Sequence, residues 1–364
     1  MKEPLRVCHL VSDDGWGGAE AVTAGLLGEQ VSDPDLRVGI VSLNPGRLTD
    51  LARELGITTY VVPEEDRGFL ALWRDVGRVL GQLNPDIVHS HRYKENTLNY
   101  LLSRRLGHRP VVTLHGDEPP NSFRLRLRRN IWRKIAKWMA LRVDAQLVAV
   151  SEDLRTVLDY PVTHCRVIPN GVRVPPPEEA PPSKGRIVGW VGRMVQIKDL
   201  PLLLQAFAEV ARHQDECELL LIGDGPERNM VERLIETLGI RDRTTVTGFV
   251  EDPSIYFSRI SLFTLTSLHE GVPLALLEAM ANGIPCLCAA VGGIPDVAGE
   301  QHALELVEER TAAAWAGAIT ELLRDPQRAR ELAERGRERV ANSFSLRSSA
   351  SRYKSLYLET VVPE

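Results

Sequence analysis

The chain has few cysteines and no long apolar run. Its 364 residues include five cysteines, an odd number: Cys8, Cys165, Cys217, Cys286 and Cys288. None of them shows CxxC or Cys/His metal-ligand spacing, so we expect core thiols in a reducing compartment rather than a disulfide framework. No apolar run is long enough to span a membrane, and the N-terminus lacks the features of a signal peptide. The sequence therefore predicts a cytoplasmic protein.

A strong net charge of either sign is also absent. The chain carries 44 basic and 49 acidic residues, a formal net charge of −5, which gives no reason to expect bulk nucleic-acid binding. A chain of this length that is 43% hydrophobic is expected to form two domains, each with its own core.

Strand-like and helix-like segments alternate along both halves of the chain. The strands are predicted at 6–11, 36–42, 58–62, 87–89, 111–115 and 146–150, and then at 186–191, 218–222, 244–247, 262–266 and 285–289. The main helices are predicted at 19–31, 70–83, 200–213, 228–238, 311–323, 328–342 and 345–358. This alternation predicts an α/β fold with a doubly wound parallel sheet in each half. Ligands are then expected beyond the carboxyl ends of the strands, in a cleft between two facing domains.

A proline-rich stretch separates the two halves. The sequence VPPPEEAPPS begins at Val174, and such a stretch packs as neither helix nor sheet, so it is interpreted as a semi-rigid linker. The expected division is 1–173, a linker at 174–184, 185–344, and a last helical segment at 345–364.

The stretch from His269 to Val297 holds two glutamates around a predicted helix start. Glu270 is expected just before the helix and Glu278 about two turns inside, on nearly the same face. A helix N-terminus suits a phosphate, and a carboxylate accepts hydrogen bonds from sugar hydroxyls. A second helix start is expected after Gly292-Gly293. An ordinary strand and helix with one solvated glutamate is the competing interpretation, but the flanking Gly, Pro and Asp residues favour a ligand site.

Two cations follow the first predicted strand of the second half. Arg193 and Lys198 would stabilise the negative charge that develops on a diphosphate leaving group; the alternative is a pair of solvent-facing charges. Two further glycine-rich turns, 223–227 and 248–250, could line a nucleotide and its base, although plain turns explain them equally well.

The first half has a glycine-rich turn and three histidines at strand ends. Gly15 to Glu20, GWGGAE, opens the first helix and would admit an anion, or it is a flexible turn. It is not the G-x-G-x-x-G of dinucleotide sites. His115 is well placed to donate to a sugar hydroxyl or phosphate; the alternative is a structural histidine, which is the more common case for a lone one. His89 and His91 flank Ser90 without a carboxylate or cysteine at metal-ligand spacing, so no metal site is predicted.

One segment is strongly basic. Residues 124–142, RLRLRRNIWRKIAKWMALR, hold eight basic residues and no acidic ones. Ile131, Ile135, Trp138 and Met139 recur at helical spacing, so this apolar stripe is expected to pack on the sheet. The surplus charge favours attraction to an anionic membrane or a lipid-phosphate acceptor, with nucleic acid a weaker option. The segment would bring the protein to the inner face of the membrane.

Together these motifs resemble the family 4 retaining glycosyltransferases (glycosyltransferase group 1) of the GT-B fold over nearly the whole chain. The matching segments are GGAE at 17–20, PDIVHSH at 85–91, HG at 115–116, VS at 150–151, IPNGV at 168–172, VGR at 191–193 with Lys198, IGDGP at 222–226, and Glu270 to Glu278. The resemblance implies two Rossmann-like domains, an N-terminal one for the acceptor and a C-terminal one for a nucleotide-sugar donor. It also implies that the last helix crosses back to the first domain.

The resemblance also implies roles for individual residues. Arg193 and Lys198 would hold the diphosphate, Glu278 the ribose, and Glu270 the donor sugar. The other implied donor-binding residues are Gly17, Gly18, Gly225, Val250, Gly271 and Val272. The catalytic residues would be Glu270, His115, Lys198 and Arg193, with no covalent nucleophile, no metal and no cofactor. Many relatives carry an aromatic-Gly pair where this chain has Val272-Pro273, so the donor sugar does not carry over.

The expected activity is retaining transfer of a sugar from a nucleotide-diphosphate-sugar to a glycan, lipid-linked or small-molecule acceptor, in cell-envelope or polysaccharide synthesis. Loops 92–96 and 116–123 are expected to choose the acceptor. Two alternatives stay open: a nucleotide-sugar epimerase of the GT-B type, and a membrane-associated binding protein without enzymatic activity.

Overall fold

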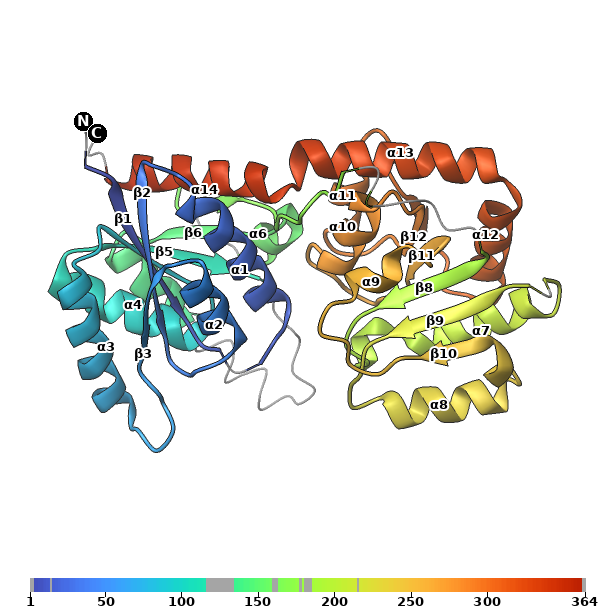
Figure 1. Ribbon diagram of the computed structural model, residues 1–364, viewed down its shortest axis with the longest axis horizontal. Helices are drawn as coiled ribbons and strands as arrows, with labels where there is room; N and C mark the ends of the chain where they lie inside the picture. The colour runs from blue at the N-terminus through green and yellow to red at the C-terminus, as the bar shows by residue number, and fades with distance from the viewer. Residues whose placement is uncertain are drawn as a thin grey trace. The chain divides into compact units, whose positions relative to one another are not determined.

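The computed structural model describes residues 3–13, 15–115, 134–158, 163–176, 179, 185–214 and 216–361. The chain forms two compact units (Figure 1). The first comprises Met1–Gly171 and Leu346–Glu364, and the second Val172–Ser345. Within the described ranges, no helix is long and apolar enough to cross a membrane.

The first unit is built on a seven-stranded parallel sheet with the order β3-β2-β1-β4-β5-β6-β7. The strands are β1 (Leu5–Val11), β2 (Leu36–Ser42), β3 (Thr58–Val61), β4 (Ile87–Ser90), β5 (Arg109–Leu114), β6 (Gln146–Ala149) and β7 (Cys165–Val167). The order along the sheet reverses between β1 and β4. Such a reversal opens a crevice at the carboxyl ends of the strands, where ligands bind in folds of this kind.

Helices cover both faces of this sheet because side chains alternate along each strand. Val7 and Val11 of β1 pack on one face, and Cys8 and Leu10 pack on the other. The first face is covered by α1 (Gly18–Val31), α2 (Arg47–Glu54) and α14 (Leu346–Val361). The second is covered by α3 (Phe69–Leu83), α4 (Tyr93–Leu106), a helix at 134–142 and α6 (Glu152–Leu158). The last helix of the chain therefore completes the core of the first unit.

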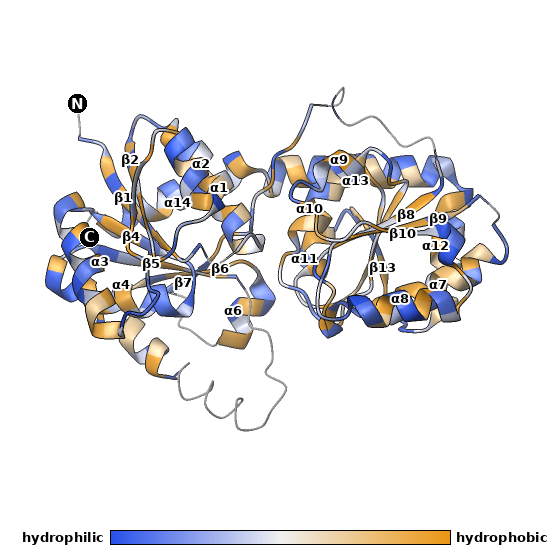
Figure 2. Ribbon diagram, turned by 60° about the horizontal axis from the view of Figure 1, so that its bottom comes forward, coloured by the Kyte–Doolittle hydropathy of each residue, from blue (hydrophilic) through white to orange (hydrophobic). Residues whose placement is uncertain are grey.

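The second unit has a six-stranded parallel sheet with the order β10-β9-β8-β11-β12-β13. The strands are β8 (Ile187–Val191), β9 (Glu218–Ile222), β10 (Thr244–Val246), β11 (Leu262–Leu265), β12 (Cys286–Ala289) and β13 (Glu305–Val307). The helices are η2 (Gln196–Lys198), α7 (Leu200–Ala211), α8 (Arg228–Thr237), η3 (Arg241–Arg243), α9 (Ser254–Phe257), α10 (Leu274–Ala281), α11 (Ile294–Ala298), α12 (Ala312–Arg324) and α13 (Pro326–Ser343). The reversal here lies between β8 and β11. Figure 2 shows apolar strands inside each unit and helices whose outward sides are more hydrophilic.

Every strand predicted from the sequence is present, with bounds within two residues of the prediction. The three-residue strands β7 and β13 were not predicted, although β10, which has the same length, was. One predicted loop is wrong: residues 93–96 form the first turn of α4, and Glu95 and Asn96 are buried. The other predicted acceptor loop, 116–123, lies outside the described residues.

The start of the proline-rich stretch is attached to the second unit. The Val172 N–H donates to the Phe344 carbonyl, and the Arg337 guanidinium donates to the Pro175 carbonyl. The chain thus passes from one unit to the other just before Val172, and again between Ser345 and Leu346.

Candidate active site

Several loops of the second unit meet at the carboxyl edge of its sheet. Met194, after β8, donates its N–H to the Asp224 carbonyl, after β9, over 2.8 Å. Leu268, after β11, donates its N–H to the Ile197 carbonyl over 2.7 Å. These backbone bonds hold the loops after β8, β9 and β11 against one another.

Glu270 is held by two donors on one oxygen. Its Oε1 lies 2.6 Å from the Lys198 Nζ, and the Ser267 hydroxyl donates to the same oxygen, also over 2.6 Å. The Lys198 and Glu270 side chains are only 20% and 9% exposed. Charge-assisted hydrogen bonds in such a partly dry site fix both side chains. An ammonium group has three N–H donors, so Lys198 keeps donors for an anion while it orients Glu270.

Arg310 is a residue of this site that the sequence analysis missed. Its Nη2 donates to the Asp199 carboxylate and to the Thr266 carbonyl, each over 2.6 Å, and its Nη1 donates to the Ser267 carbonyl over 3.0 Å. Arg310 therefore ties the loop that carries Lys198 to the loop that carries Glu270. It follows β13, a strand that was not predicted, so its place at this sheet edge was not visible in the sequence.

The Gly292-Gly293 turn supports Glu270 from behind. The Gly293 N–H donates to the Glu270 carbonyl over 3.0 Å. Gly292 has a φ of +53°, and a Cβ added there would lie 1.9 Å from the same carbonyl oxygen. Only glycine fits such a position without strain. Helix α11 begins directly afterwards at Ile294, where a second helix start was expected.

Close backbone packing explains why residue 225 is a glycine. A Cβ there would lie 2.4 Å from the Met194 carbonyl oxygen, and a Cβ at Gly223 would lie 1.8 Å from that of Gly192. The turn after β9 is therefore glycine-rich because it packs against the backbone after β8. This packing does not test the predicted contact of Gly225 with a donor.

Glu278 lies about one turn inside α10, not two as predicted, because the helix begins only at Leu274. Glu270 precedes the helix, so the predicted common helical face does not apply to this pair. Burial, with a smaller contribution from the nearby negative charge of Asp252, raises the pKa of Glu278 to about 7. A carboxyl that is partly protonated near neutral pH can both donate to and accept from hydroxyl groups.

The other predicted donor-binding residues of the second unit lie at or near the same edge. Arg193 is exposed, and its side chain has no hydrogen bond or ion pair with another described residue. Gly271 and Val272 lead into α10 between Glu270 and an extended Pro273. Val250 packs on the core of the unit. The structure thus joins Lys198 to Glu270, and among the described residues Arg193 makes no hydrogen bond or ion pair with either.

In the first unit, Gly17 and Gly18 are exposed at the start of α1. Gly17 has an extended backbone and occupies the N-cap position without a capping side chain. The first N–H groups of this 14-residue helix carry the positive end of its dipole, which is the arrangement that an anion requires.

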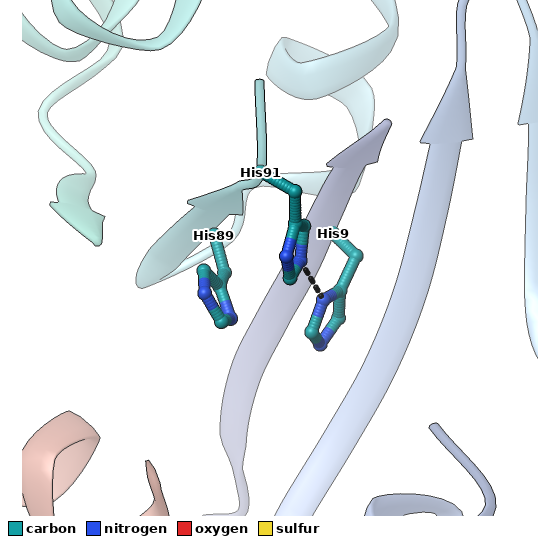
Figure 3. Close-up of side chains that lie close together, drawn as sticks. All are labelled: His9, His89 and His91. Carbon is teal, nitrogen blue, oxygen red and sulfur yellow. Dashed lines mark hydrogen bonds between the residues drawn. The ribbon is translucent and has the colours of Figure 1, made fainter. Parts of the chain in front are cut away.

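His115, just after β5, belongs to a histidine cluster that the sequence spacing did not reveal. His9 of β1 lies beside His89 of β4, and His91 contacts both rings (Figure 3). His115 in turn contacts His91. One ring nitrogen from each of His9, His89 and His91 lies within 4.8 Å of the other two. Burial lowers the pKa of His9 and of His115 to about 4, and those of His89 and His91 well below the usual value. These rings are therefore neutral at pH 7.

The described part of the basic segment packs differently from the prediction. Residues 134–142 are helical, and Met139 and Ala140 pack in the core of the first unit. Trp138 is 59% exposed and Ile135 38% exposed, so the prediction that both pack on the sheet is wrong. Met139 and Ala140, and not Ile135 and Trp138, are therefore the residues that face the sheet. The rest of the segment, including Ile131, lies outside the described residues.

Comparison with known proteins identifies the family. Residues 16–174 match the family model of Glycosyltransferase Family 4, and residues 175–339 match that of Glycosyl transferases group 1. The N-acetyl-alpha-D-glucosaminyl L-malate synthase of Bacillus anthracis is 26% identical over 94% of both chains. A UDP-Gal:alpha-D-GlcNAc-diphosphoundecaprenol alpha-1,3-galactosyltransferase of Escherichia coli is 24% identical over 92% of both chains.

Solved structures agree in fold. Anabaena HepE, solved in complexes with UDP and with UDP-glucose, superposes with a TM-score of 0.83 at 19% identity, over 98% of this chain and 100% of HepE. A sucrose-phosphate synthase from Thermosynechococcus elongatus superposes with a TM-score of 0.77 at 21% identity, over 97% of this chain and 98% of the synthase. With two doubly wound units and two adjoining family matches, the chain belongs to the family 4, group 1 glycosyltransferases of the GT-B fold.

Proposed function

We propose that the chain transfers a sugar from a nucleoside-diphosphate-sugar to a hydroxyl acceptor with retention of anomeric configuration, and that the second unit holds the donor. The observation that carries this proposal is Glu270, fixed by Lys198 and Ser267 and backed by the Gly292-Gly293 turn. A carboxylate so oriented is suited to the hydroxyls of a sugar, and the ammonium beside it to a diphosphate.

In the proposed mechanism the leaving diphosphate takes the proton of the acceptor hydroxyl on the same face of the sugar. The bond from the anomeric carbon to the diphosphate breaks while the bond to the acceptor oxygen forms. Lys198 and Arg193 stabilise the negative charge on the diphosphate, which is the main contribution that fixed cations make to such a step. Glu278 holds the ribose. Gly17 and Gly18 bind the donor, and His115 is a catalytic residue, as the family resemblance implies.

Ligand-induced stabilisation tests the donor. UDP is the first candidate because HepE was solved with UDP and UDP-glucose. A ligand at about 100 times its Kd adds about 2.7 kcal/mol to the stability of the folded state. We expect UDP or GDP, and one of their sugar conjugates, to raise the melting temperature of the wild type, and Lys198→Met to abolish the shift. A wild type that no nucleoside diphosphate stabilises would contradict the proposal.

A purified nucleotide-sugar incubated without acceptor separates transfer from epimerisation. We expect no conversion to an epimeric nucleotide-sugar, and with acceptor an anomeric configuration in the product that matches the donor. Nuclear magnetic resonance of the product reports both. Epimer formation without acceptor, or an inverted product, would each refute the corresponding part of the proposal.

The helix at 134–142, which is the described part of the basic segment, supports a second proposal, namely contact with an anionic membrane surface. Ile135, Trp138 and Leu141 are exposed at 38%, 59% and 39%, beside the basic residues Lys134, Lys137 and Arg142. Exposed apolar side chains flanked by lysine and arginine are typical of helices that lie in a membrane interface.

Vesicle sedimentation tests this contact. We expect the wild type to bind phosphatidylglycerol vesicles with a salt-sensitive affinity, and Trp138→Ser with Lys137→Gln to weaken binding at least tenfold. Leu70→Ser is the matched control, since Leu70 is 79% exposed in α3 of the same unit. Equal binding by all three proteins, or binding to neutral vesicles only, would refute the membrane contact.

A further inference from the structure

The histidine cluster lies in the first unit, on the face of the sheet that α1 and α14 cover. His9 and His89 are register partners on β1 and β4. Gln30 comes from α1, and Tyr353 and Tyr357 come from α14. The His9, His89, Gln30 and Tyr357 side chains are at most 2% exposed. Every polar atom here therefore depends on a protein partner.

Three of the histidines form a continuous chain of ring-to-ring contacts. Gln30 Oε1 lies 2.9 Å from the His9 Nε2, His9 Nδ1 lies 3.2 Å from the His91 Nε2, and His91 Nδ1 lies 3.2 Å from the His115 Nε2. In Figure 3, His9 and His91 point toward each other and His89 stands beside them. Successive rings differ in plane by 14° and 23°, with centroids 5.5 Å apart. Such rings meet edge to edge, as an in-plane N–H···N hydrogen bond requires.

The direction of this chain follows from Gln30. Its amide Nε2 donates to the Tyr357 hydroxyl, so its Oε1 faces His9 as an acceptor. A neutral imidazole has one N–H and one bare nitrogen. His9 must therefore carry its proton on Nε2, which leaves Nδ1 to accept from His91. The same logic places the His91 proton on Nε2, and then the His115 proton on Nε2.

We propose that Gln30, His9 and His91 are positioning residues that fix the tautomer of His115, leaving its Nδ1 as a bare acceptor for a hydroxyl group of the ligand. The side chain of Asn170 also hydrogen bonds to His115. Because His115 Nε2 already meets His91, Nδ1 is the ring atom that Asn170 or a ligand hydroxyl can share. An acceptor of this kind favours a sugar hydroxyl and disfavours a phosphate or carboxylate oxygen, which has no proton to give.

Hydrogen bonding accounts for the cluster better than a metal ion does. Both ring nitrogens of His89 already lie 2.7 Å from hydroxyl oxygens, those of Tyr357 and Thr113. Both nitrogens of His9 and of His91 are engaged in the chain. A metal would have to displace these hydrogen-bond partners.

Nitrogen-15 spectra of the histidine rings in the full chain test the tautomers directly. We expect His9, His91 and His115 to be neutral and protonated on Nε2 at pH 7. Gln30→Met removes the acceptor that His9 Nε2–H needs. An unpaired buried donor is costly, so the three protons are expected to move to Nδ1, with the Nδ1–H population of His115 rising by about tenfold or more. Gln214→Met, at a buried glutamine of the second unit, is expected to change nothing.

A binding measurement connects the tautomer to the ligand. This part rests on the proposed function, whereas the spectra do not. With UDP and UDP-glucose as probes, Gln30→Met is expected to leave the Kd of UDP unchanged. Gln30→Met should raise the Kd of UDP-glucose roughly three- to tenfold, which corresponds to about the contribution of one neutral hydrogen bond. Gln30→Glu keeps an acceptor toward His9 and is expected to keep the wild-type tautomers, which covers the case in which Gln30→Met fails to fold.

Three results would overturn the inference. The first is a wild-type His115 protonated on Nδ1. The second is an unchanged set of tautomers in a folded Gln30→Met. The third is a stoichiometric change in the His9, His89 and His91 resonances on addition of Zn²⁺, which would make the cluster a metal site. A failure of the proposed donor chemistry alone would leave the three tautomers as stated.

Discussion

At the scale of single residues, the Lys198–Glu270 pair is the strongest feature of the second unit. The two residues are 72 positions apart in sequence and share a 2.6 Å contact that Ser267 reinforces. The pair has two consequences that can be measured separately. It stabilises the loops after β8 and β11, and it holds a carboxylate and an ammonium group next to each other in the candidate active site.

Lys198→Met is therefore expected to cost about 1–3 kcal/mol in the free energy of unfolding, since it leaves Glu270 without its cation. It should also lower kcat at least roughly hundredfold through the loss of charge stabilisation. Urea unfolding and steady-state kinetics measure the two effects. Arg53→Ala breaks an exposed pair with Asp50 and is expected to change stability by less than about 0.5 kcal/mol. Normal turnover by Lys198→Met would remove Lys198 from the site.

Arg310 acts on the same pair from a distance. Its guanidinium holds the Asp199 carboxylate and the Thr266 and Ser267 carbonyls, so Arg310→Lys loses at least one of these bonds while keeping the charge. We expect a several-fold rise in the KM of the donor, with stability reduced by about 1–2 kcal/mol. A donor KM equal to that of the wild type would show that the loop is held by its backbone bonds alone.

At the scale of elements, turns rather than helices decide where the site residues lie. The Gly292-Gly293 turn before α11 meets the backbone of Glu270, and the Gly223–Gly225 turn after β9 meets the backbone after β8. Each contact is backbone against backbone, so neither can relax by a change of rotamer. The geometry of the site is thus fixed by positions that have no side chain.

Gly292→Ala tests this. The new Cβ would lie 1.9 Å from the Glu270 carbonyl oxygen at a φ of +53°, so we expect a loss of about 2 kcal/mol or more in stability and a large loss of donor binding. Gly317→Ala in α12 is the matched control, since nothing lies within 4 Å of its Cβ position. It should stabilise the unit by about 0.5–1 kcal/mol. Similar effects of the two substitutions would show that the turn can move.

Sequence reasoning recovered the long elements because their periodicity is local. Lys198, Glu270 and the exposed Gly18 were placed at strand or helix ends from the sequence, and the contact between Lys198 and Glu270 is now seen. Arg310 and His9 could not be found in this way. Each reaches its partners only through sheet order, which joins β13 to β12 and β1 to β4, and a pattern along the chain does not contain that order.

At the scale of the whole molecule, acid is expected to act on the two units in opposite directions. In the first unit, burial lowers the pKa of His9, His108 and His115 to about 4, and it lowers those of His89 and His91 well below the usual value. The unfolded chain then binds more protons than the folded one below about pH 6.5, so stability falls as pH falls. In the second unit, folding raises the pKa of Glu278 to about 7. The folded state therefore binds an extra proton as pH falls, and the free energy of unfolding of this unit rises.

Peptide-resolved hydrogen exchange between pH 7 and 5 reports the local stability of both units in one experiment, once the rates are corrected for intrinsic exchange. Peptides from β1 and β4 are expected to lose protection, each neutral histidine contributing up to about 1.4 kcal/mol per pH unit. Raised pKa values at the buried Glu20 and Glu95 offset part of this loss. Peptides from α10 should gain protection, and Glu278→Gln should remove that gain. A change of the same sign in both units would contradict the assignment.

The last helix, α14, joins the first unit after the entire second unit has intervened in the sequence. Tyr353 and Tyr357 of α14 are at most 2% exposed and close the hydrogen-bond network around His89 and Thr113. During synthesis the N-terminal unit must therefore wait for the end of the chain, while the second unit can fold first. A chain cut after residue 345 would therefore keep the whole of the second unit and lack the helix that completes the core of the first.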